Sequence, residues 1–257
     1  MARSGARGRD LSGRRVLVTG GSSGIGAASA AALAAAGATV AVTGRDAAAL
    51  AAVASAWNGT TIPADLRHPA APGEVVAKAA AALGGLDTLV CAAGTGWSGF
   101  TADMAAEDID ALVDLNVRVP LQMARAALGE LAAAPSASLV LVGSITGLVG
   151  APREAVYSAT KAALDGFAGA LRFEVDDHVA VSIIHPGAVD TPFFARRNRP
   201  YERRWPRPMP VDRVARAVVE TVATGRRSVV VPGWMEVAAR IHGAAPGLYR
   251  VLARRLA

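Results

Sequence analysis

Tyr157 and Lys161 are four residues apart in the sequence, and Ser144 lies thirteen residues before the tyrosine. In a helix, residues at i and i+4 lie on the same face, so the Lys161 ammonium can lie beside the Tyr157 phenol. A tyrosine with its ordinary pKa of about 10 is roughly one part in a thousand ionised at neutral pH, and a neighbouring cation favours the phenolate. The spacing therefore predicts a phenol that can donate and accept a proton. An ordinary helix surface that carries an aromatic residue and a cation is the alternative.

A glycine-rich segment, TGGSSGIG, occupies residues 19–26. It follows a short apolar run at 16–18 that predicts a buried strand, and it leads into an alanine-rich stretch at 27–36 that predicts a helix ending at Gly37. In such a strand–turn–helix unit, glycines allow the backbone to approach a pyrophosphate, and the helix N-terminus supplies free N–H groups. The segment predicts a dinucleotide-binding turn. A tight turn that binds nothing is the alternative.

Strands and helices alternate along the whole chain. The predicted strands are 15–19, 38–43, 59–63, 86–91, 137–143, 179–185 and 228–231. The predicted helices are 24–36, 46–56, 72–83, 104–132, 156–175 and 212–223, with a broken helical tail from 234. Apolar strands joined by helical crossovers are typical of a parallel sheet that is covered on both faces. We therefore expect an α/β fold, with a single doubly wound Rossmann-type domain at 11–257, a mostly parallel seven-stranded sheet, and a flexible tail at 1–10.

The two motifs, with others in a fixed order, make the sequence similar to the short-chain dehydrogenase/reductase family. The motifs are, in order, the glycine turn, Asp65, Ala92-Ala93-Gly94, Asn116, Ser144, Tyr157 with Lys161, and Pro186-Gly187 followed by Thr191. The similarity covers nearly the whole chain. It implies direct hydride transfer between a nicotinamide dinucleotide and a carbonyl or alcohol carbon.

The resemblance also implies a role for each of four catalytic residues. Tyr157 would exchange the proton with the substrate oxygen, and Ser144 would donate a hydrogen bond to that oxygen. Lys161 would lower the pKa of Tyr157 and bind the nicotinamide ribose. Asn116 would hold a water molecule that links Lys161 to solvent. Without the resemblance, a buried asparagine bonded to backbone is the better interpretation of Asn116.

The choice of cofactor is predicted from the residues that close the second strand. A carboxylate there would bind the adenosine ribose and favour NAD, but the chain has Gly44 followed by Arg45. A guanidinium suits a 2′-phosphate, so the sequence favours NADP(H) over NAD(H), with Ser22 as a second donor. A solvated arginine is the alternative, and Asp65 could contact adenine or simply cap a helix. The predicted cofactor-binding residues are Gly20, Ser22, Ser23, Gly24, Ile25, Gly26, Arg45, Asp65, Leu66, Ala92, Ala93, Gly94, Tyr157, Lys161, Pro186, Gly187, Val189 and Thr191.

Cys91 is a departure from the family pattern, which usually has asparagine at this position. The asparagine typically bonds neighbouring strands near the cofactor, and a thiol replaces it poorly. We expect some loss of local rigidity without loss of cofactor binding. A buried, inert thiol is the favoured interpretation of Cys91, and a reactive one is the alternative.

The segment 192–210 lies where the family places its substrate lid. It contains four aromatic residues and six arginines. It therefore suits either an apolar pocket with a positively charged mouth, for a thioester or another anionic ketone, or a mobile solvated loop. The predicted pocket residues are Trp97, Thr146, Val149, Ala188, Phe193 and Phe194, with Phe100 and Leu148 expected nearby.

Composition narrows the classes of partner. The net charge of +6 comes from arginines spread over many helices, and no recognition helix for nucleic acid is evident. A single cysteine excludes an internal disulfide, and the sparse histidines argue against a zinc site. No apolar run approaches the roughly 18 residues that span a bilayer, so we expect a cytoplasmic protein.

Contacts with other molecules are predicted at two places. The tail at 234–257 could form a basic amphipathic helix on an anionic membrane surface, but packing on the body or on another subunit is favoured. The resemblance implies a homodimer or homotetramer that pairs through the two long central helices.

Two functions from different classes follow. The first is an NADP(H)-dependent oxidoreductase acting on a ketone or secondary alcohol of an apolar small molecule or acyl thioester. The second is a non-catalytic dinucleotide-sensing or scaffolding protein that keeps the fold. The four catalytic residues favour the first.

Overall fold

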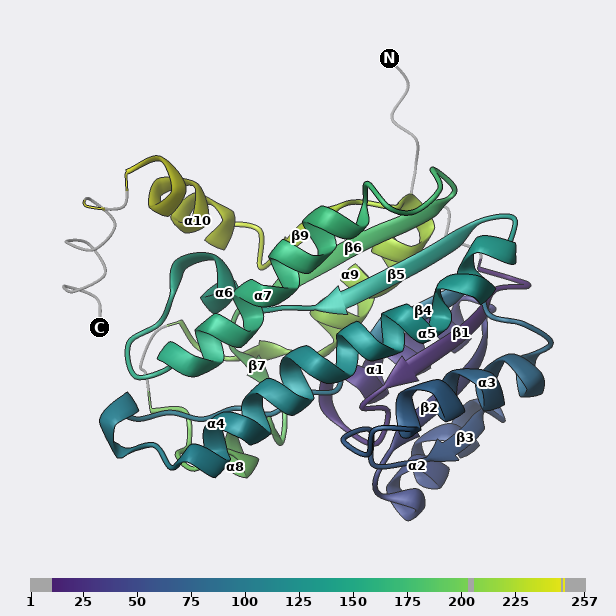
Figure 1. The fold of residues 1–257 in the computed structure, drawn as a ribbon, viewed down its shortest axis with the longest axis horizontal. Coiled ribbons are helices and arrows are strands. Elements are labelled where there is room, and N and C mark those ends of the chain that lie inside the picture. The colour runs from purple at the N-terminus through teal and green to yellow at the C-terminus, as the bar shows by residue number, and fades with distance from the viewer. Residues whose placement is uncertain (1–10, 203–205, 246, 248–257) are drawn as a thin grey trace.

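Seven parallel strands form the central sheet of the computed structural model, in the order β3-β2-β1-β4-β5-β6-β9 (Figure 1). The structure describes residues 11–202, 206–245 and 247, so the predicted tail at 1–10 and residues 246 and 248–257 of the predicted C-terminal helical tail lie outside the described residues. The strands of this sheet are β1 (Arg15–Thr19), β2 (Thr39–Gly44), β3 (Thr60–Pro63), β4 (Thr88–Cys91), β5 (Ala137–Val142), β6 (Val179–Pro186) and β9 (Ser228–Val231). All seven predicted strands are confirmed, with ends that shift by up to two residues.

Helices cover both faces of the sheet (Figure 1). The helices are α1 (Gly24–Ala35), α2 (Ala47–Ala54), α3 (Ala71–Leu83), α4 (Ala106–Val113), α5 (Val119–Ala133), α6 (Ile145–Val149), α7 (Ala155–Leu171), α8 (Phe193–Arg196), α9 (Asp212–Thr224) and α10 (Met235–Ala244). Side chains alternate along each strand between two buried cores, because neighbouring residues of a strand point to opposite faces. Leu17 packs in the core beneath α3, α5 and α7, whereas Val16 and Val18 pack in the core beneath α1, α2 and α9. The predicted doubly wound α/β architecture is confirmed.

The predicted single helix at 104–132 is wrong in one respect, because it is divided at its centre. A π-helical turn, Asp114–Arg118, separates α4 from α5 and contains Asn116. Pro120 has no N–H to donate to the carbonyl four residues earlier, at Asn116, so the regular α-helical ladder cannot continue through this point. The interruption lies beside the functional site, as π-helical turns frequently do.

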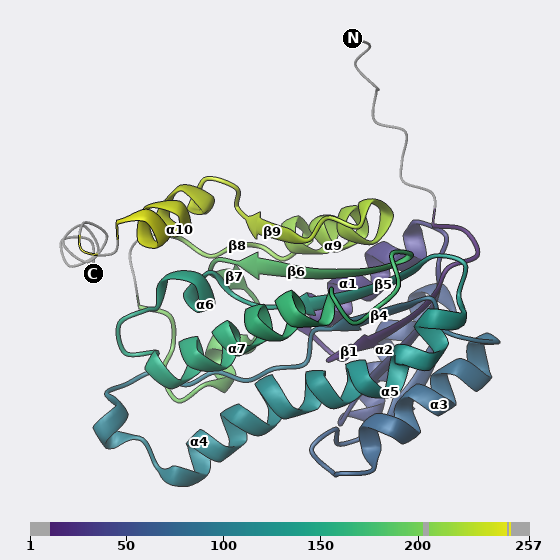
Figure 2. The ribbon, with the colours of Figure 1, turned by 45° about the horizontal axis from the view of Figure 1, so that its top comes forward.

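The strands end on one side of the molecule. In Figures 1 and 2 the arrowheads of β5 and β6 point toward the end where α6, α8 and α10 lie. A small two-stranded sheet, β7 (Val189–Asp190) with β8 (Met209–Pro210), follows the end of β6 and joins the two ends of the lid segment. Among the described residues, no helix is both long enough and apolar enough to cross a membrane.

Candidate active site

A cleft of about 550 Å³ lies along the carboxyl ends of the strands. All eighteen predicted cofactor-binding residues line it, and so does Ser144. Four of the six predicted substrate-pocket residues also line it, namely Thr146, Ala188, Phe193 and Phe194. The sheet therefore brings the glycine turn and the tyrosine–lysine pair into one cavity.

The glycine turn is shaped by close backbone approaches. Gly20 has φ +70°, and a Cβ built on it would lie 2.9 Å from the Ala93 Cα. A Cβ on Gly26 would lie 2.2 Å from the Gly20 carbonyl oxygen, so no side chain fits there either. Ser23 stands at the N-cap of α1 in extended backbone, ahead of the free N–H groups of the first helical turn. This cradle fits a pyrophosphate, because it offers backbone donors and the positive end of a helix dipole.

Thr19 joins the end of β1 to the loop after β4. Its Oγ1 accepts hydrogen bonds from the backbone N–H groups of Ala92 and Ala93, each at 3.0 Å. This hydroxyl bridges two neighbouring strands at the position where the family asparagine is replaced by Cys91. Cys91 itself is buried, and burial raises the pKa of its thiol to about 12. The interpretation of Cys91 as an inert thiol is therefore supported.

Tyr157 and Lys161 lie on α7 as predicted, but the electrostatic expectation for the pair is wrong in this structure. Burial raises the pKa of Tyr157 above its usual value, and the charge of Glu154 raises it further. A hydrogen bond with Ser144 and the charge of Arg197 lower that pKa, whereas Lys161 makes no resolved contribution. The Lys161 Nζ lies 5.8 Å from the centre of the Tyr157 ring and donates to the Val142 carbonyl oxygen at 3.0 Å.

Lys161 is itself perturbed. Only 6% of the residue is exposed, and burial lowers the pKa of its ammonium to about 8. Desolvation disfavours the charged form of lysine just as it disfavours the phenolate of tyrosine. The same burial therefore moves both groups of the pair toward their neutral forms, which sequence spacing alone does not reveal.

Ser144 caps the short helix α6. Its Oγ accepts hydrogen bonds from the Thr146 N–H at 3.2 Å and from the Thr146 hydroxyl at 3.0 Å. Both of these contacts use Ser144 as the acceptor, so its own proton is left for the hydrogen bond with the Tyr157 hydroxyl that lowers the pKa of the tyrosine. Ser144 is thus placed beside Tyr157, and its role as a donor to the substrate oxygen stays a prediction. The residue is 8% exposed.

Asn116 lies behind the cleft rather than in its lining. Its Oδ1 accepts from the Thr95 N–H at 2.9 Å, and its Nδ2 donates to the Thr95 carbonyl at 2.9 Å and to the Thr160 hydroxyl at 3.2 Å. The side chain therefore agrees with the alternative of a buried asparagine that forms hydrogen bonds with backbone groups. A Cβ on Gly94 would lie 3.1 Å from Asn116 Oδ1 and 3.5 Å from Lys161 Nζ. Both side chains therefore approach the backbone at Gly94.

The end of the cleft beside the ends of β2 and β3 is lined by two arginines, Arg45 and Arg67. Arg45 follows β2 directly, and a Cβ on Gly44 would lie 3.5 Å from the Ser22 Oγ, so Ser22 and the Arg45 backbone are near neighbours. Asp65 is held by Arg67, with 2.7 Å between Oδ2 and Nη2, and this hydrogen-bonded pair lowers the pKa of Asp65 to about 2. The Asp65 carboxylate is therefore ionised, and it already accepts hydrogen bonds from Arg67. The sequence interpretation did not include Arg67.

The segment 196–198 is held by contacts with two residues of the cleft wall and with the loop after β4. Arg196 donates from Nη1 to the Ser23 Oγ at 2.8 Å. Arg197 forms an ion pair with Glu154, with 2.9 Å between Nη1 and Oε1. Asn198 exchanges two hydrogen bonds with the Ser98 backbone, each at 2.8 Å. These contacts disfavour the alternative of a solvated loop for 193–198, whereas Arg203, Arg204 and Trp205 lie outside the described residues.

Trp97 and Val149 do not line the cleft, so these two pocket predictions are wrong. Gly99 donates its N–H to the Arg153 carbonyl at 2.7 Å, and a Cβ on Gly99 would lie 2.6 Å from the Trp97 ring. The indole therefore folds back over its own loop instead of entering the cavity. Phe100 and Leu148 are also absent from the lining, and Phe100 is 62% exposed beneath the Arg153 guanidinium.

Several residues that line the cleft were not predicted. They are Arg67, Thr95, Glu154 and Met235, among others, whereas Tyr201, Arg196 and Arg197 belong to the segment 192–210 that the sequence suggested as a pocket with a positively charged mouth. Glu154 has a sequence signal, because it lies three residues before Tyr157 at the start of the same helix. Met235 has none: it comes from α10, and its sulfur would lie 2.6 Å from a Cβ on Gly187.

Comparisons with known proteins agree with this geometry. The family model for short chain dehydrogenases matches residues 14–202. A short-chain type dehydrogenase/reductase from Sinorhizobium fredii is 37% identical over 180 residues, which are 69% of this chain and 71% of that protein. A hydroxysteroid 11-beta-dehydrogenase 1-like protein from Gallus gallus is 34% identical over 245 residues, which are 91% of this chain and 82% of that protein.

Solved structures give the same result. A short chain dehydrogenase from Burkholderia cenocepacia, solved in complex with NADP, superposes with a TM-score of 0.78 at 33% identity, over 87% of this chain and 98% of that one. A family member from Burkholderia phymatum, solved with NAD, has a TM-score of 0.83 at 22% identity, which supports the fold alone. With its glycine turn, its parallel sheet and its tyrosine–lysine helix, this chain belongs to the short-chain dehydrogenase/reductase family of oxidoreductases.

Proposed function

We propose that this protein is an NADP(H)-dependent oxidoreductase that interconverts a ketone and a secondary alcohol on an apolar small molecule. The observation that carries the proposal is that Ser144, Tyr157 and Lys161 line the same cleft as the glycine turn. Bound nicotinamide supplies or accepts the hydride at the substrate carbon. Side chains of the protein transfer the proton and stabilise the charge on the substrate oxygen.

Tyr157 is the proton donor in the reducing direction. Its raised pKa keeps the phenol protonated at neutral pH, so it can give a proton to the carbonyl oxygen as that oxygen becomes an alcohol. Ser144, whose hydroxyl lies beside that of Tyr157, donates a hydrogen bond to the same oxygen and stabilises the charge that develops there. The hydroxyls of Tyr157 and Ser144 thus both donate to the substrate oxygen.

Lys161 returns a proton to Tyr157 after each reduction. Its contact with the Val142 carbonyl holds the ammonium at the end of β5, between Tyr157 and the position expected for a nicotinamide ribose. With a pKa lowered to about 8, it can pass a proton near neutral pH and thereby reprotonate the tyrosine. Asn116 supports this region by fixing the Thr95 backbone, and a water molecule held near it would complete the relay.

Preference for NADP(H) is supported by the residues around Arg45. Ser22 and Arg45 line the same end of the cleft, and no acidic residue follows β2 until Asp46, whose carboxylate accepts from the Ala49 N–H as the cap of α2. Asp46 is therefore engaged as a helix cap, and the Arg45 guanidinium remains to bind a 2′-phosphate. The neighbour from Burkholderia cenocepacia was solved with NADP, which agrees with this assignment.

An apolar substrate is favoured over an anionic thioester by the charges of the lid. Phe193 lies 5.9 Å from Tyr157, centre to centre, and Phe194 and Tyr201 continue this aromatic wall. Arg197, which is buried beside them, is neutralised by Glu154. The wall beside Tyr157 thus offers aromatic surface, and the lid arginine that packs against this surface carries a compensated charge. The name of the Gallus gallus relative, which refers to a hydroxysteroid dehydrogenase, agrees with an alcohol on an apolar skeleton.

The proposal is tested by mixing the purified protein with NADPH and a panel of aldehydes and ketones graded in size and charge, and following NADPH absorbance. We expect turnover that increases with the apolar area of the ketone and is weaker with carboxylated analogues. Tight NADPH binding without turnover of any panel member, in both directions, would instead support the dinucleotide-sensing alternative. The pairing of subunits and the proposed lid at 192–210 are separate questions, answered by sedimentation and by a ligand-bound structure.

A further inference from the structure

Two neighbouring arginines of the lid have different electrostatic surroundings. Arg197 is almost fully buried and is paired with Glu154. Arg196, by contrast, donates to the uncharged hydroxyl of Ser23, and no carboxylate among the described residues lies within ion-pair distance of its guanidinium. Both arginines line the cleft, but only one of the two charges is compensated inside the protein.

The exposed Arg196 guanidinium lies beside a second positive group, the N-terminus of α1. Ser23 is the N-cap of α1, a helix of twelve residues, and its side chain makes no capping bond to that helix. The helix N-terminus carries a partial positive charge, and acidic side chains are absent from its first turn. The guanidinium therefore adds a second positive group beside the first, an arrangement that an anion placed between the two would stabilise.

The base of the lid is packed against the same turn by an independent contact. A Cβ built on Gly24, which has φ +55°, would lie 3.4 Å from the Thr191 Cβ. Thr191 follows β7 directly, and its Oγ1 accepts from the Phe193 N–H at 3.4 Å, at the start of α8. This short connection keeps Arg196 close to the glycine turn.

We propose that Arg196 binds the pyrophosphate of the dinucleotide from the lid side, opposite the N-terminus of α1. The guanidinium exchanges its bond to the Ser23 hydroxyl for charge-assisted bonds to phosphate oxygens, which are stronger. Cofactor binding then attaches α8 to the glycine turn through the ligand. The inference rests on the proposed function, since it concerns how the same cleft holds its dinucleotide.

The test separates the pyrophosphate from the 2′-phosphate by calorimetric titration with NADPH, NADH, ADP-ribose and adenosine 2′-monophosphate. R196Q should bind the three pyrophosphate-containing ligands about 10- to 150-fold more weakly, the range expected for losing one charged hydrogen bond. Its affinity for adenosine 2′-monophosphate should not change, which also shows that the variant is folded. R196K, which retains a charge without the planar fork, should lie between the wild type and R196Q.

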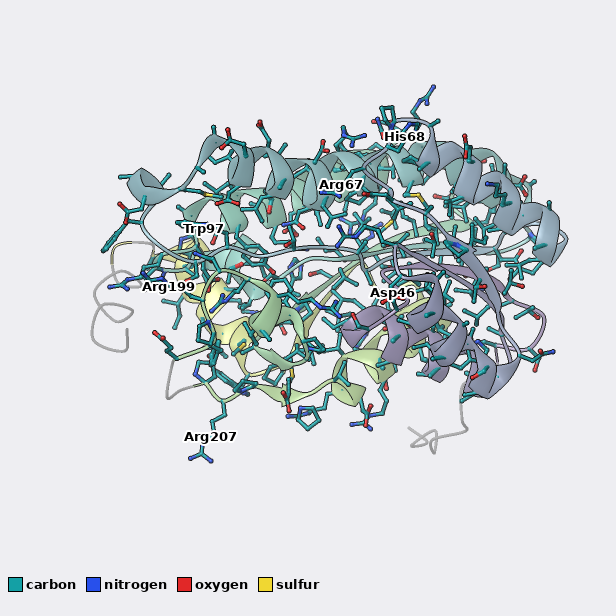
Figure 3. The ribbon with its side chains drawn as sticks, turned by 90° about the horizontal axis from the view of Figure 1, so that it is seen from below. Asp46, Arg67, His68, Trp97, Arg199 and Arg207 are labelled. Atoms are coloured by element: carbon teal, nitrogen blue, oxygen red, sulfur yellow. The ribbon has the colours of Figure 1, made fainter. Side chains whose placement is uncertain are left out.

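The matched control is R207Q, because Arg207 is exposed, projects away from the molecule and does not line the cleft (Figure 3). It should leave all four affinities unchanged, which excludes a general effect of net charge. Unchanged NADPH and NADH affinity in R196Q, with an increase only in the KM of the carbonyl substrate, would overturn the assignment in favour of substrate recognition. Failure of the wild type to bind any dinucleotide would reject the proposed function itself.

Discussion

Arg197 of the lid and Glu154 at the start of α7 form an ion pair at 2.9 Å, with side chains that are only 6% and 11% exposed. The pair lies against the aromatic wall, because the Arg197 guanidinium is 4.9 Å from the centre of the Phe194 ring. The two charges have opposite effects on Tyr157: that of Glu154 raises the pKa of the phenol, and that of Arg197 lowers it. The ion pair therefore connects the segment that carries Arg197 to the electrostatic surroundings of Tyr157.

Replacing one member of this pair should shift the pH dependence of alcohol oxidation. E154Q removes a charge that disfavours the phenolate and should move the rise in rate to lower pH, whereas R197M should move it to higher pH. Single-turnover oxidation with NADP measures both midpoints. The double variant should lie near the wild type, and shifts of the two single variants in the same direction would contradict this electrostatic coupling.

Replacing Tyr157 by phenylalanine should remove catalysis without removing cofactor binding. We expect kcat to fall about 10²- to 10⁴-fold, the usual contribution of a positioned general acid. The dissociation constant of NADPH should change by less than about twofold, since the ring and its contact with Phe193 are kept. Stopped-flow NADPH oxidation and calorimetric titration are the measurements. Equal rates in both proteins would remove Tyr157 from the proton-donor role.

Replacing Arg45 by alanine should change cofactor preference. NADPH affinity should fall about 10- to 100-fold, as expected for losing charged hydrogen bonds to the 2′-phosphate, while NADH affinity stays within about threefold. The exposed Arg207 again provides an arginine-to-alanine control. Parallel losses for both cofactors would mean that Arg45 does not read the 2′-phosphate.

The buried Lys161 should leave a signature in the pH dependence of stability. Its pKa is lowered from 10.5 in the unfolded chain to about 8 in the folded protein, so the unfolded state binds more protons between these values. Stability must therefore rise with pH across this window, by up to about 3 kcal/mol for a shift of this size. Urea denaturation from pH 7 to 10.5 should show this rise for the wild type relative to K161M. Parallel curves for the two proteins would show that the ammonium is not desolvated.

The positions of the strands and of the main motifs could be predicted because they depend on local information. Apolar runs such as Val16–Val18 fit a buried strand. Glycines such as Gly26, where another backbone segment approaches too closely for a side chain, appear in the sequence as a regularly spaced motif. The convergence of Ser144, Tyr157 and Lys161 also followed, since the carboxyl ends of parallel strands lie at one edge of the sheet. Pro120 was a local signal for the helix break at Asn116. The hydrogen bonds between the Asn116 side chain and the Thr95 backbone had no such signal, because the two residues are far apart in the sequence.

What the amino-acid sequence determined by itself was the α/β fold, the family and the set of groups that meet in the cleft. Only the tertiary structure decided the charge state and the surroundings of those groups. Arg196 and Arg197 are adjacent in the chain, yet one reaches Ser23, 173 positions away, and the other reaches Glu154, 43 positions away. The pKa of Tyr157 is likewise raised rather than lowered, because desolvation depends on everything packed around the phenol and not on the residue four positions along its helix.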